Sequence, residues 1–167
     1  MDTMNAPNAM TSAKSTAKKI LIVDDERHIR TLLKQSLRKL TDAGAVLLFA
    51  ENGVEAMRFI ERERPALIFL DLMMPGLHGF DVCLLAKSEP RYNNPHIIIL
   101  SARSQSLDKQ MGSISGADEY ITKPFDPEFV AARATEILRI DLTATAEVPA
   151  VSTNPSNPNP ATASASN

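Results

Sequence analysis

Four strand-like segments of the 167-residue sequence are each followed by a polar residue whose chemistry suits a phosphoryl group or a metal ion. The segments read ILIV, ALIFL, IIIL and EYIT. The polar residues that follow them are Asp24 and Asp25, Asp71, Ser101 and Lys123. Ligands of open α/β sheets bind just beyond the carboxyl ends of parallel strands. If the four segments are neighbouring parallel strands, three carboxylates, a hydroxyl and an ammonium share one crevice.

The three carboxylates raise an electrostatic problem. Adjacent strands lie about 5 Å apart, so Asp24, Asp25 and Asp71 would repel one another. Either one carboxylate stays protonated or a cation binds between them. An oxygen-rich site with two or three carboxylates and room for water suits Mg²⁺. The alternative is that Asp24 or Asp25 simply caps the next helix. We favour the metal because the pair faces a third aspartate across the switch point, where the first and third strands are expected to lie side by side.

The other polar residues suit phosphoryl chemistry. A carboxylate such as Asp71 can attack phosphorus and form an aspartyl phosphate. A helix cap is the alternative for Asp71, but residues 72–75 do not resemble a helix start. Ser101 and Lys123 could each contact a phosphoryl oxygen. Taken alone, the serine is also typical of a turn or a cap, and the lysine is also typical of a solvated surface. Pro124 leaves open a cis bond after Lys123, because X–Pro bonds adopt that form more readily than others.

The elements that must position these residues alternate along the chain. Apolar runs predict strands near residues 20–23, 46–49, 66–70, 97–100 and 119–122. Between and after them, apolar residues at helical spacing predict helices near residues 29–40, 54–60, 80–87, 107–114 and 129–137. The strands are continuously apolar, as expected when helices cover both faces of a parallel sheet. We therefore predict an α/β fold, (βα)5, with a doubly wound five-stranded parallel sheet in the flavodoxin-like order 2-1-3-4-5.

Composition predicts one domain with two tails. Hydrophobic residues make up 44%, charged residues 23%, and the net charge is −2, which gives no sign of a nucleic-acid-binding surface. Residues 18–140 carry the hydrophobic pattern, whereas residues 1–17 and 141–167 have the composition of disordered tails.

The single cysteine, Cys83, lies among apolar residues and is expected to be buried. No segment resembles a membrane span or a secretory signal, so we expect a cytoplasmic protein.

Residues 18–140 resemble the receiver domain of two-component response regulators, as in single-domain chemotaxis and phosphorelay regulators. Four segments carry the resemblance: ILIVDDE at 20–26, DLMMPG at 71–76, SA at 101–102 and GADEYITKPF at 116–125. The resemblance implies that Asp71 is the phospho-acceptor. It also implies that Asp25, Asp71 and the backbone carbonyl of Met73 bind Mg²⁺, with Asp24 acting mainly through water. Ser101 and Lys123 then read the phosphoryl group, and Tyr120 is the aromatic residue that turns inward during switching.

The resemblance further implies a signalling switch and no enzyme beyond the catalysis of its own phosphorylation and dephosphorylation. The expected donor is a sensor histidine kinase or a histidine phosphotransfer protein, which would dock on the helix at 26–40. The surface charges of that helix otherwise form an ordinary solvated face; they are Arg27, Arg30, Lys34, Arg38 and Lys39. The readout surface is expected near 107–138. Residues after 141 have no basic recognition helix, so we expect protein contacts without DNA binding, and a phosphorylation-dependent dimer stays open.

Two other functions share parts of this pattern. A Mg²⁺-dependent phosphatase with an aspartyl intermediate would use a similar acidic crevice. Phosphatases of the haloacid dehalogenase type place two aspartates two positions apart after the first strand, whereas Asp24 and Asp25 are adjacent. A receiver-like module that binds partners without phosphorylation usually lacks one of the acidic or lysine positions, and this chain lacks none.

Overall fold

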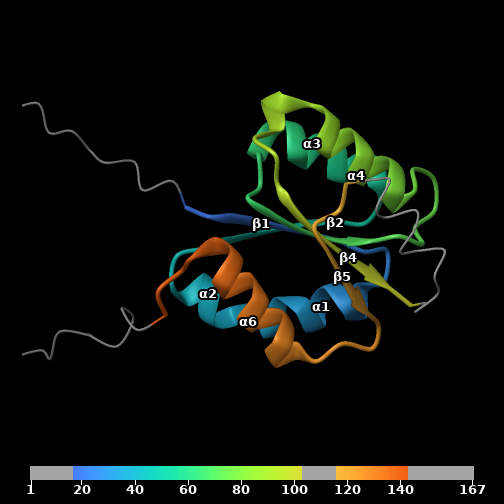
Figure 1. The fold of residues 1–167 in the computed structure, drawn as a ribbon. Coiled ribbons are helices and arrows are strands. Elements are labelled where there is room, and N and C mark those ends of the chain that lie inside the picture. The colour runs from blue at the N-terminus through green and yellow to red at the C-terminus, as the bar shows by residue number, and fades with distance from the viewer. Residues whose placement is uncertain (1–16, 103–115, 143–167) are drawn as a thin grey trace, which may run out of the picture.

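The chain forms a three-layer α/β domain in which one sheet lies between two layers of helices (Figure 1). The computed structural model describes residues 17–102 and 116–142. The helix expected through Leu107, Met111 and Ile114 lies outside the described residues. The same holds for the tail residues 1–16 and 143–167.

The sheet has five strands, all parallel, in the order β2-β1-β3-β4-β5, which confirms the predicted topology. β3 is fully buried along its whole length, because helices cover both of its faces. β1 and β3 are direct neighbours although a strand and two helical regions separate them in the chain. The strands are β1 Lys19–Val23, β2 Val46–Ala50, β3 Leu67–Asp71, β4 His96–Ser101 and β5 Glu119–Thr122.

The helices divide between the two faces of the sheet. Figure 1 shows α1, α2 and α6 on one side and α3 and α4 on the other. The corresponding bounds are α1 Arg27–Ser36, α2 Arg38–Asp42, α3 Gly53–Glu63, α4 Gly79–Ser88 and α6 Pro127–Leu138, with a short 3₁₀ helix, η1, at Pro90–Tyr92. Asp126 caps α6 by accepting a hydrogen bond from the Glu128 N–H, and Pro127 occupies the first turn.

The helix expected to run continuously to Leu40 is interrupted at Leu37. The backbone there leaves helical geometry, and the Leu40 N–H donates to the Leu37 carbonyl, three residues back. Leu33, Leu37 and Leu40 are nevertheless all fully buried. The tightened turn therefore keeps these three leucines in the core cluster beneath α1, α2 and α6.

The core consists of two hydrophobic clusters separated by the sheet. Alternate residues of β1 face opposite ways: Ile20 and Ile22 pack with α1, α2 and α6, whereas Leu21 and Val23 pack with α3 and α4. Cys83 lies within the second of these groups and is fully buried, as expected. Within residues 17–102 and 116–142, no helix is long and apolar enough to cross a membrane.

A cluster of charged side chains ties β4 and β5 to α6 at the amino-terminal edge of the sheet. Arg133 Nε donates to Glu119 Oε2 at 3.0 Å, and His96 Nε2 lies 3.1 Å from Glu119 Oε1. The hydrogen bond from Arg133 holds the pKa of Glu119 below its usual value, more than offsetting the effect of burial. The folded state therefore favours the ionised form of Glu119.

We predict that Glu119→Gln lowers the free energy of unfolding at neutral pH by about 1 kcal/mol, because it removes a partly buried charge-assisted pair. A carboxylate with a depressed pKa stabilises the fold above the ordinary glutamate pKa, and this contribution is lost as the pH falls through the lowered pKa. Urea unfolding at several pH values should show the difference between variant and wild type shrinking in acid. Glu136→Gln is the control, since Glu136 pairs with the same arginine but is exposed. Equal losses in the two variants would contradict the assignment.

Candidate functional site

The sheet brings the predicted site residues to one edge. Asp24 directly follows β1, and Asp71 is the last residue of β3. The pairing of Val23 with Leu70 places these two aspartates side by side. Ser101 ends β4 opposite Thr122, and Lys123 follows immediately. Four strands that are distant in sequence therefore end around one small volume.

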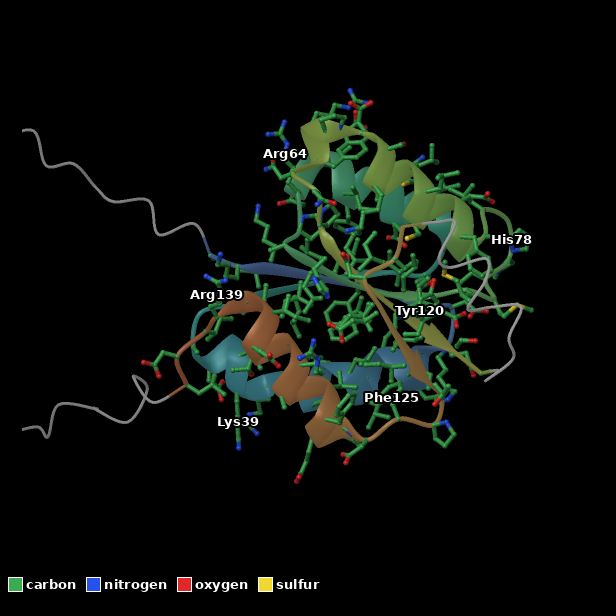
Figure 2. The ribbon with its side chains drawn as sticks, in the orientation of Figure 1. Lys39, Arg64, His78, Tyr120, Phe125 and Arg139 are labelled. Atoms are coloured by element: carbon green, nitrogen blue, oxygen red, sulfur yellow. The ribbon has the colours of Figure 1, made fainter. Side chains whose placement is uncertain are left out.

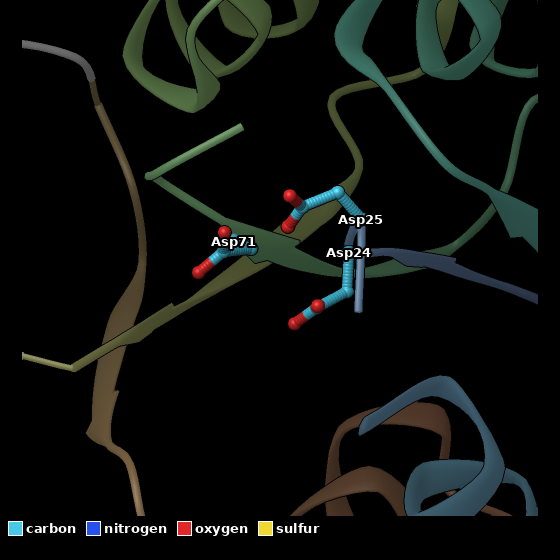
Figure 3. A group of neighbouring side chains, drawn as sticks. All are labelled: Asp24, Asp25 and Asp71. Carbon is cyan, nitrogen blue, oxygen red and sulfur yellow. The ribbon is translucent and has the colours of Figure 1, made fainter. Parts of the chain in front are cut away.

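The three aspartates form a compact carboxylate cluster (Figure 3). One oxygen from each of Asp24, Asp25 and Asp71 can be chosen so that all three lie within 4.8 Å of one another. Asp24 and Asp71 are buried, with 0% and 4% exposure, whereas Asp25 is exposed. The cluster is thus closed on the sheet side and reachable from solvent on the other.

Lys123 provides the cation of this site. Its Nζ donates to Asp24 Oδ2 at 2.7 Å and to Asp71 Oδ1 at 3.0 Å, and it lies 3.9 Å from Glu26 Oε1. The Lys123 N–H donates to the carbonyl of Ser101 at 2.7 Å, which holds the start of this loop against β4. The Lys123–Pro124 peptide bond is cis, the form that the sequence left open.

The backbone fixes the second oxygen of each buried carboxylate. Asp24 Oδ1 accepts from the Glu26 N–H at 2.9 Å, and Asp71 Oδ2 accepts from the Met73 N–H at 3.1 Å. The residue that caps α1 is Glu26, and it makes no side-chain capping bond. The capping alternative considered for Asp24 and Asp25 is therefore not what the structure shows.

Electrostatics within the cluster shift two pKa values. Burial raises the pKa of Asp71, and the hydrogen bond from Lys123 only partly opposes that shift. For Lys123, burial alone would lower the pKa, but its hydrogen bonds to Asp24 and Asp71 outweigh burial and raise it. Lys123 therefore stays charged at neutral pH and compensates part of the carboxylate repulsion.

Two residues at the start of α1, the N-cap Glu26 and Arg30 within the helix, support the site although the sequence analysis did not assign them to it. Arg30 was expected on a solvated face, but its side chain is only 11% exposed. Its Nη1 donates to the carbonyls of Asp24 and Asp25 at 2.7 and 3.0 Å. Glu26 adds a third carboxylate near Lys123, after Asp24 and Asp71. Glu26 belongs to the acidic segment at 24–26, which was the available signal, whereas no sequence pattern reveals an arginine bound to backbone carbonyls.

The loop after Asp71 is held by a close backbone approach. A Cβ atom on Gly79 would lie 2.2 Å from the Asp71 carbonyl oxygen, so only glycine fits at this start of α4. Met74 is buried within the core cluster, whereas Met73 is 73% exposed. The loop thus anchors through Met74 and leaves the side chain of Met73 in solvent beside the carboxylates.

Ser101 and Tyr120 lie on the two strands that complete the edge. Ser101 is buried, with 5% exposure. Tyr120 packs against the core cluster on the α3 and α4 side of the sheet, and its phenolic oxygen is buried. Figure 2 labels Tyr120 on β5. In this structure the aromatic ring therefore occupies an inward position.

The donor set of the cluster fits Mg²⁺. All three candidate ligands are carboxylate oxygens, and the exposed side of Asp25 leaves space for water, which Mg²⁺ normally retains. Two buried carboxylates that share one ammonium also leave negative charge for a divalent cation to neutralise.

A family model for the response regulator receiver domain matches residues 20–135. The chain belongs to this family. It is therefore a receiver domain of two-component signalling. Domains of this family are phosphorylation-dependent switches and generally bind Mg²⁺ at an acidic pocket, to which the aspartate cluster corresponds. The family and the fold that we inferred from the sequence are therefore confirmed.

Curated relatives agree with this assignment. The chain is 43% identical over 122 residues to the alkaline phosphatase synthesis transcriptional regulatory protein PhoP of Bacillus subtilis, covering 73% of this chain and 49% of that protein. It is 35% identical over 115 residues to protein PilG of Pseudomonas aeruginosa, covering 69% and 83%. The chain thus spans about half the length of PhoP and most of PilG.

Solved structures show the same fold. A putative response regulator from Chloroflexus aurantiacus matches with a TM-score of 0.66 and 30% identity, covering 74% of this chain and 98% of that one. The chemotaxis protein CheY4 of Vibrio cholerae matches with a TM-score of 0.64 and 29% identity, covering 72% and 98%.

We predict that Lys123→Met destabilises the receiver domain by about 3 kcal/mol at neutral pH without Mg²⁺, because it leaves buried carboxylates without their cation. Adding Mg²⁺ should restore part of the loss, since the metal would supply the missing positive charge. Thermal unfolding with and without Mg²⁺ measures both effects.

Lys87→Met is the matched control. The Lys87 side chain is similarly enclosed, at 14% exposure, and pairs with Asp118 at 2.7 Å away from the carboxylate cluster. Mg²⁺ should rescue only the Lys123 variant. Equal rescue of both variants, or of neither, would contradict a metal site at the three aspartates.

Proposed function

We propose that this receiver domain accepts a phosphoryl group on Asp71 from the phosphohistidine of a sensor kinase or phosphotransfer protein, and signals through protein contacts. The observation that carries the proposal is the grouping of Asp71, Asp24 and Asp25 with the Lys123 ammonium at one sheet edge. This arrangement combines a nucleophile, a candidate metal site and a fixed cation. We assign the Mg²⁺ ligands to Asp24, Asp25, Asp71 and the carbonyl of Met73, with Asp24 acting mainly through water.

In the proposed reaction a carboxylate oxygen of Asp71 attacks phosphorus. The new O–P bond forms as the N–P bond of the phosphohistidine breaks, and the imidazole leaves with the electron pair. Bound Mg²⁺ would supply positive charge to the transferring phosphoryl oxygens. Lys123, which already contacts Asp71 Oδ1, would shift to a phosphoryl oxygen of the product. The hydrogen bond from the Met73 N–H orients the Asp71 carboxylate throughout.

The proposed switch links the acceptor to β5. A phosphoryl group on Asp71 would draw the hydroxyl of Ser101 toward it, and Tyr120 would occupy the space on the inner side. The position of Tyr120 with its phenolic oxygen buried supports such a state. Phosphorylation then shifts a population between two arrangements by its differential affinity for them.

Several finer expectations remain predictions. PhoP and the ycf27 proteins are named transcriptional regulators, and the chain covers about half of their length. Action through protein contacts without DNA therefore stays a prediction. The same holds for cytoplasmic placement, a phosphorylation-dependent dimer, and domain limits at 18–140.

We predict that the chain incubated with Mg²⁺ and acetyl phosphate gains one phosphoryl group, detected by intact mass, and that neutral hydroxylamine removes it as expected for an acyl phosphate. Asp71→Asn should abolish the gain, whereas Asp81→Asn, a change of the same kind on the neighbouring helix α4, should not. Undiminished labelling of Asp71→Asn would contradict the proposal that Asp71 is the phospho-acceptor. Continuous turnover of unrelated phosphate esters would instead indicate a phosphatase.

A second prediction concerns the switch. The sequence contains two tyrosines and no tryptophan, so Tyr92→Phe leaves Tyr120 as the reporter of intrinsic fluorescence. Phosphorylation of this variant should change the Tyr120 emission as the inward population grows. Adding Ser101→Ala should remove most of the change while labelling by mass persists. A full fluorescence change without the serine hydroxyl would refute its part in the switch.

A further inference from the structure

The sheet has an open edge at β2. The strand order places β2 last, where β1 is its only hydrogen-bonded neighbour among the described strands. Edge strands expose unpaired backbone N–H and C=O groups, and proteins usually protect them with charged side chains, proline or a bulge. The sequence of β2, VLLFA, has no charged residue and no proline, and residues 46–49 are all at least partly exposed. This edge therefore has the properties of a template for a further strand.

The hydrogen bonds to β1 show which backbone groups of β2 point outward. The Val46 N–H donates to the residue before β1 at 2.9 Å, and the Ala50 carbonyl accepts from the residue after β1 at 3.2 Å. In a strand, successive residues direct their backbone groups to opposite sides, so every second residue, from Val46 to Ala50, faces β1. The N–H and C=O groups of Leu47 and Phe49 therefore face away from β1, at the edge of the described sheet.

A groove of about 600 Å³ lies beside this edge on the α1 side of the sheet. The side chains of Leu47 and Phe49 form the apolar part of its wall. Lys34 of α1 and Arg38 of α2 contribute positive charge, and Asp42 is the one carboxylate among the described residues that line it. The same two residues of β2 thus present outward backbone groups and an apolar surface below exposed cations.

The charges around the groove favour an acidic occupant. Asp42 lies 3.9 Å from Arg38 in a pair whose side chains are 82% and 61% exposed, so it offsets little of the positive charge. Lys34 is exposed and has no ion pair within the described ranges, and α1 contains no acidic residue. A smaller hollow continues the groove along α1 and is lined by two arginines and no acid. One of these, Arg30, is already paired with Glu51.

The same charges disfavour a second copy of this chain as the occupant. An antiparallel pairing of two β2 edges about a two-fold axis would join the same patch of both copies. Lys34 and Arg38 of one copy would then lie on the same face of the joined sheet as those of the other. Like charges brought together across paired strands are destabilising. An acidic partner meets no such repulsion.

We propose that the β2 edge docks an extended segment of a partner protein in which acidic and apolar residues alternate. Its backbone pairs with the outward groups of Leu47 and Phe49, and so extends the sheet by one strand. Because side chains of a strand alternate between the two faces, its carboxylates face Lys34 and Arg38 while its apolar residues cover Val46, which is 39% exposed on the other face. The phosphorylation site takes no part, so the proposal does not depend on the phospho-acceptor.

Peptide binding to the full chain tests the charge and the pattern. A fluorescein-labelled heptapeptide of alternating glutamate and valine should bind, as measured by fluorescence anisotropy at low salt. Peptides of alternating glutamate and serine, or lysine and valine, should bind at least roughly ten-fold more weakly. N-methylation of three consecutive central amides of the glutamate–valine peptide should weaken binding similarly, because it removes donors to β2. Equal binding of the glutamate–serine peptide would show attraction by charge alone and overturn the proposal.

Charge reversal in the protein locates the cations. Lys34→Glu combined with Arg38→Glu should weaken binding of the glutamate–valine peptide by roughly ten-fold or more. The matched control is Lys39→Glu combined with Arg91→Glu, which makes the same change of charge at residues that do not line the groove. All four positions are exposed, so the fold should tolerate both double variants. Equal weakening in the two would contradict docking at the β2 edge.

Amide hydrogen exchange identifies the backbone contact. In the free protein the amides of Leu47 and Phe49 should exchange faster than that of Leu48, which faces β1. A saturating concentration of the glutamate–valine peptide should slow the two outward amides roughly ten-fold and leave those of β5, at the opposite edge, unchanged. No slowing at Leu47 and Phe49 would overturn the proposal. Slowing that rises with protein concentration in the absence of peptide would also overturn it, and would assign the edge to a second copy.

Discussion

The functional edge of this receiver domain depends on one ammonium group held between two buried carboxylates. Lys123 bonds to Asp24 after β1 and to Asp71 at the end of β3, while its backbone is fixed to Ser101 of β4. A cation or phosphoryl group that enters the site must compete with Lys123 for the oxygens of Asp24 and Asp71, because Lys123 Nζ already donates to both carboxylates. The lysine belongs to the segment that leaves β5. A change of charge at Asp71 therefore has a short physical route to Tyr120, three residues earlier in the chain.

The loop between β3 and α4 is the second constraint on the site. Gly79 brings the start of α4 against the Asp71 backbone, and Gly53 allows the start of α3 to meet Leu77, whose carbonyl would lie 2.4 Å from an added Cβ atom. The first residues of α3 and α4 thus both lie against the loop between β3 and α4. Because Met74 is buried and Met73 is not, the loop has one anchored residue and one residue free to face an incoming molecule.

Much of this arrangement could be predicted from sequence because its causes are local or periodic. Continuously apolar strands indicated a sheet covered on both faces, and polar residues at their ends indicated a shared crevice. The interruption at Leu37 was not predictable, since a helix and a tightened turn can present the same buried leucines. Arg30 was misread for a different reason: its Nη1 bonds to the main-chain carbonyls of Asp24 and Asp25, and because every residue has such a carbonyl, no side-chain pattern indicates these bonds. The proposed role of Met73 as a metal ligand also rests on a main-chain carbonyl, so the type of its side chain does not indicate it, and this role stays a proposal.

The two edges of the sheet carry different kinds of charge cluster. At the carboxyl edge, like charges crowd together around Lys123, and burial opposes the ionisation of Asp71. At the amino edge, acidic side chains pair with basic ones, as Glu119 does with Arg133 and Glu63 does with Lys19. The strands, each only four to six residues long, keep these clusters a full strand length apart. Substitutions at the amino edge can therefore raise or lower the stability of the domain without changing the carboxylate cluster at the carboxyl edge. A thermostable variant is best sought by altering the amino edge alone.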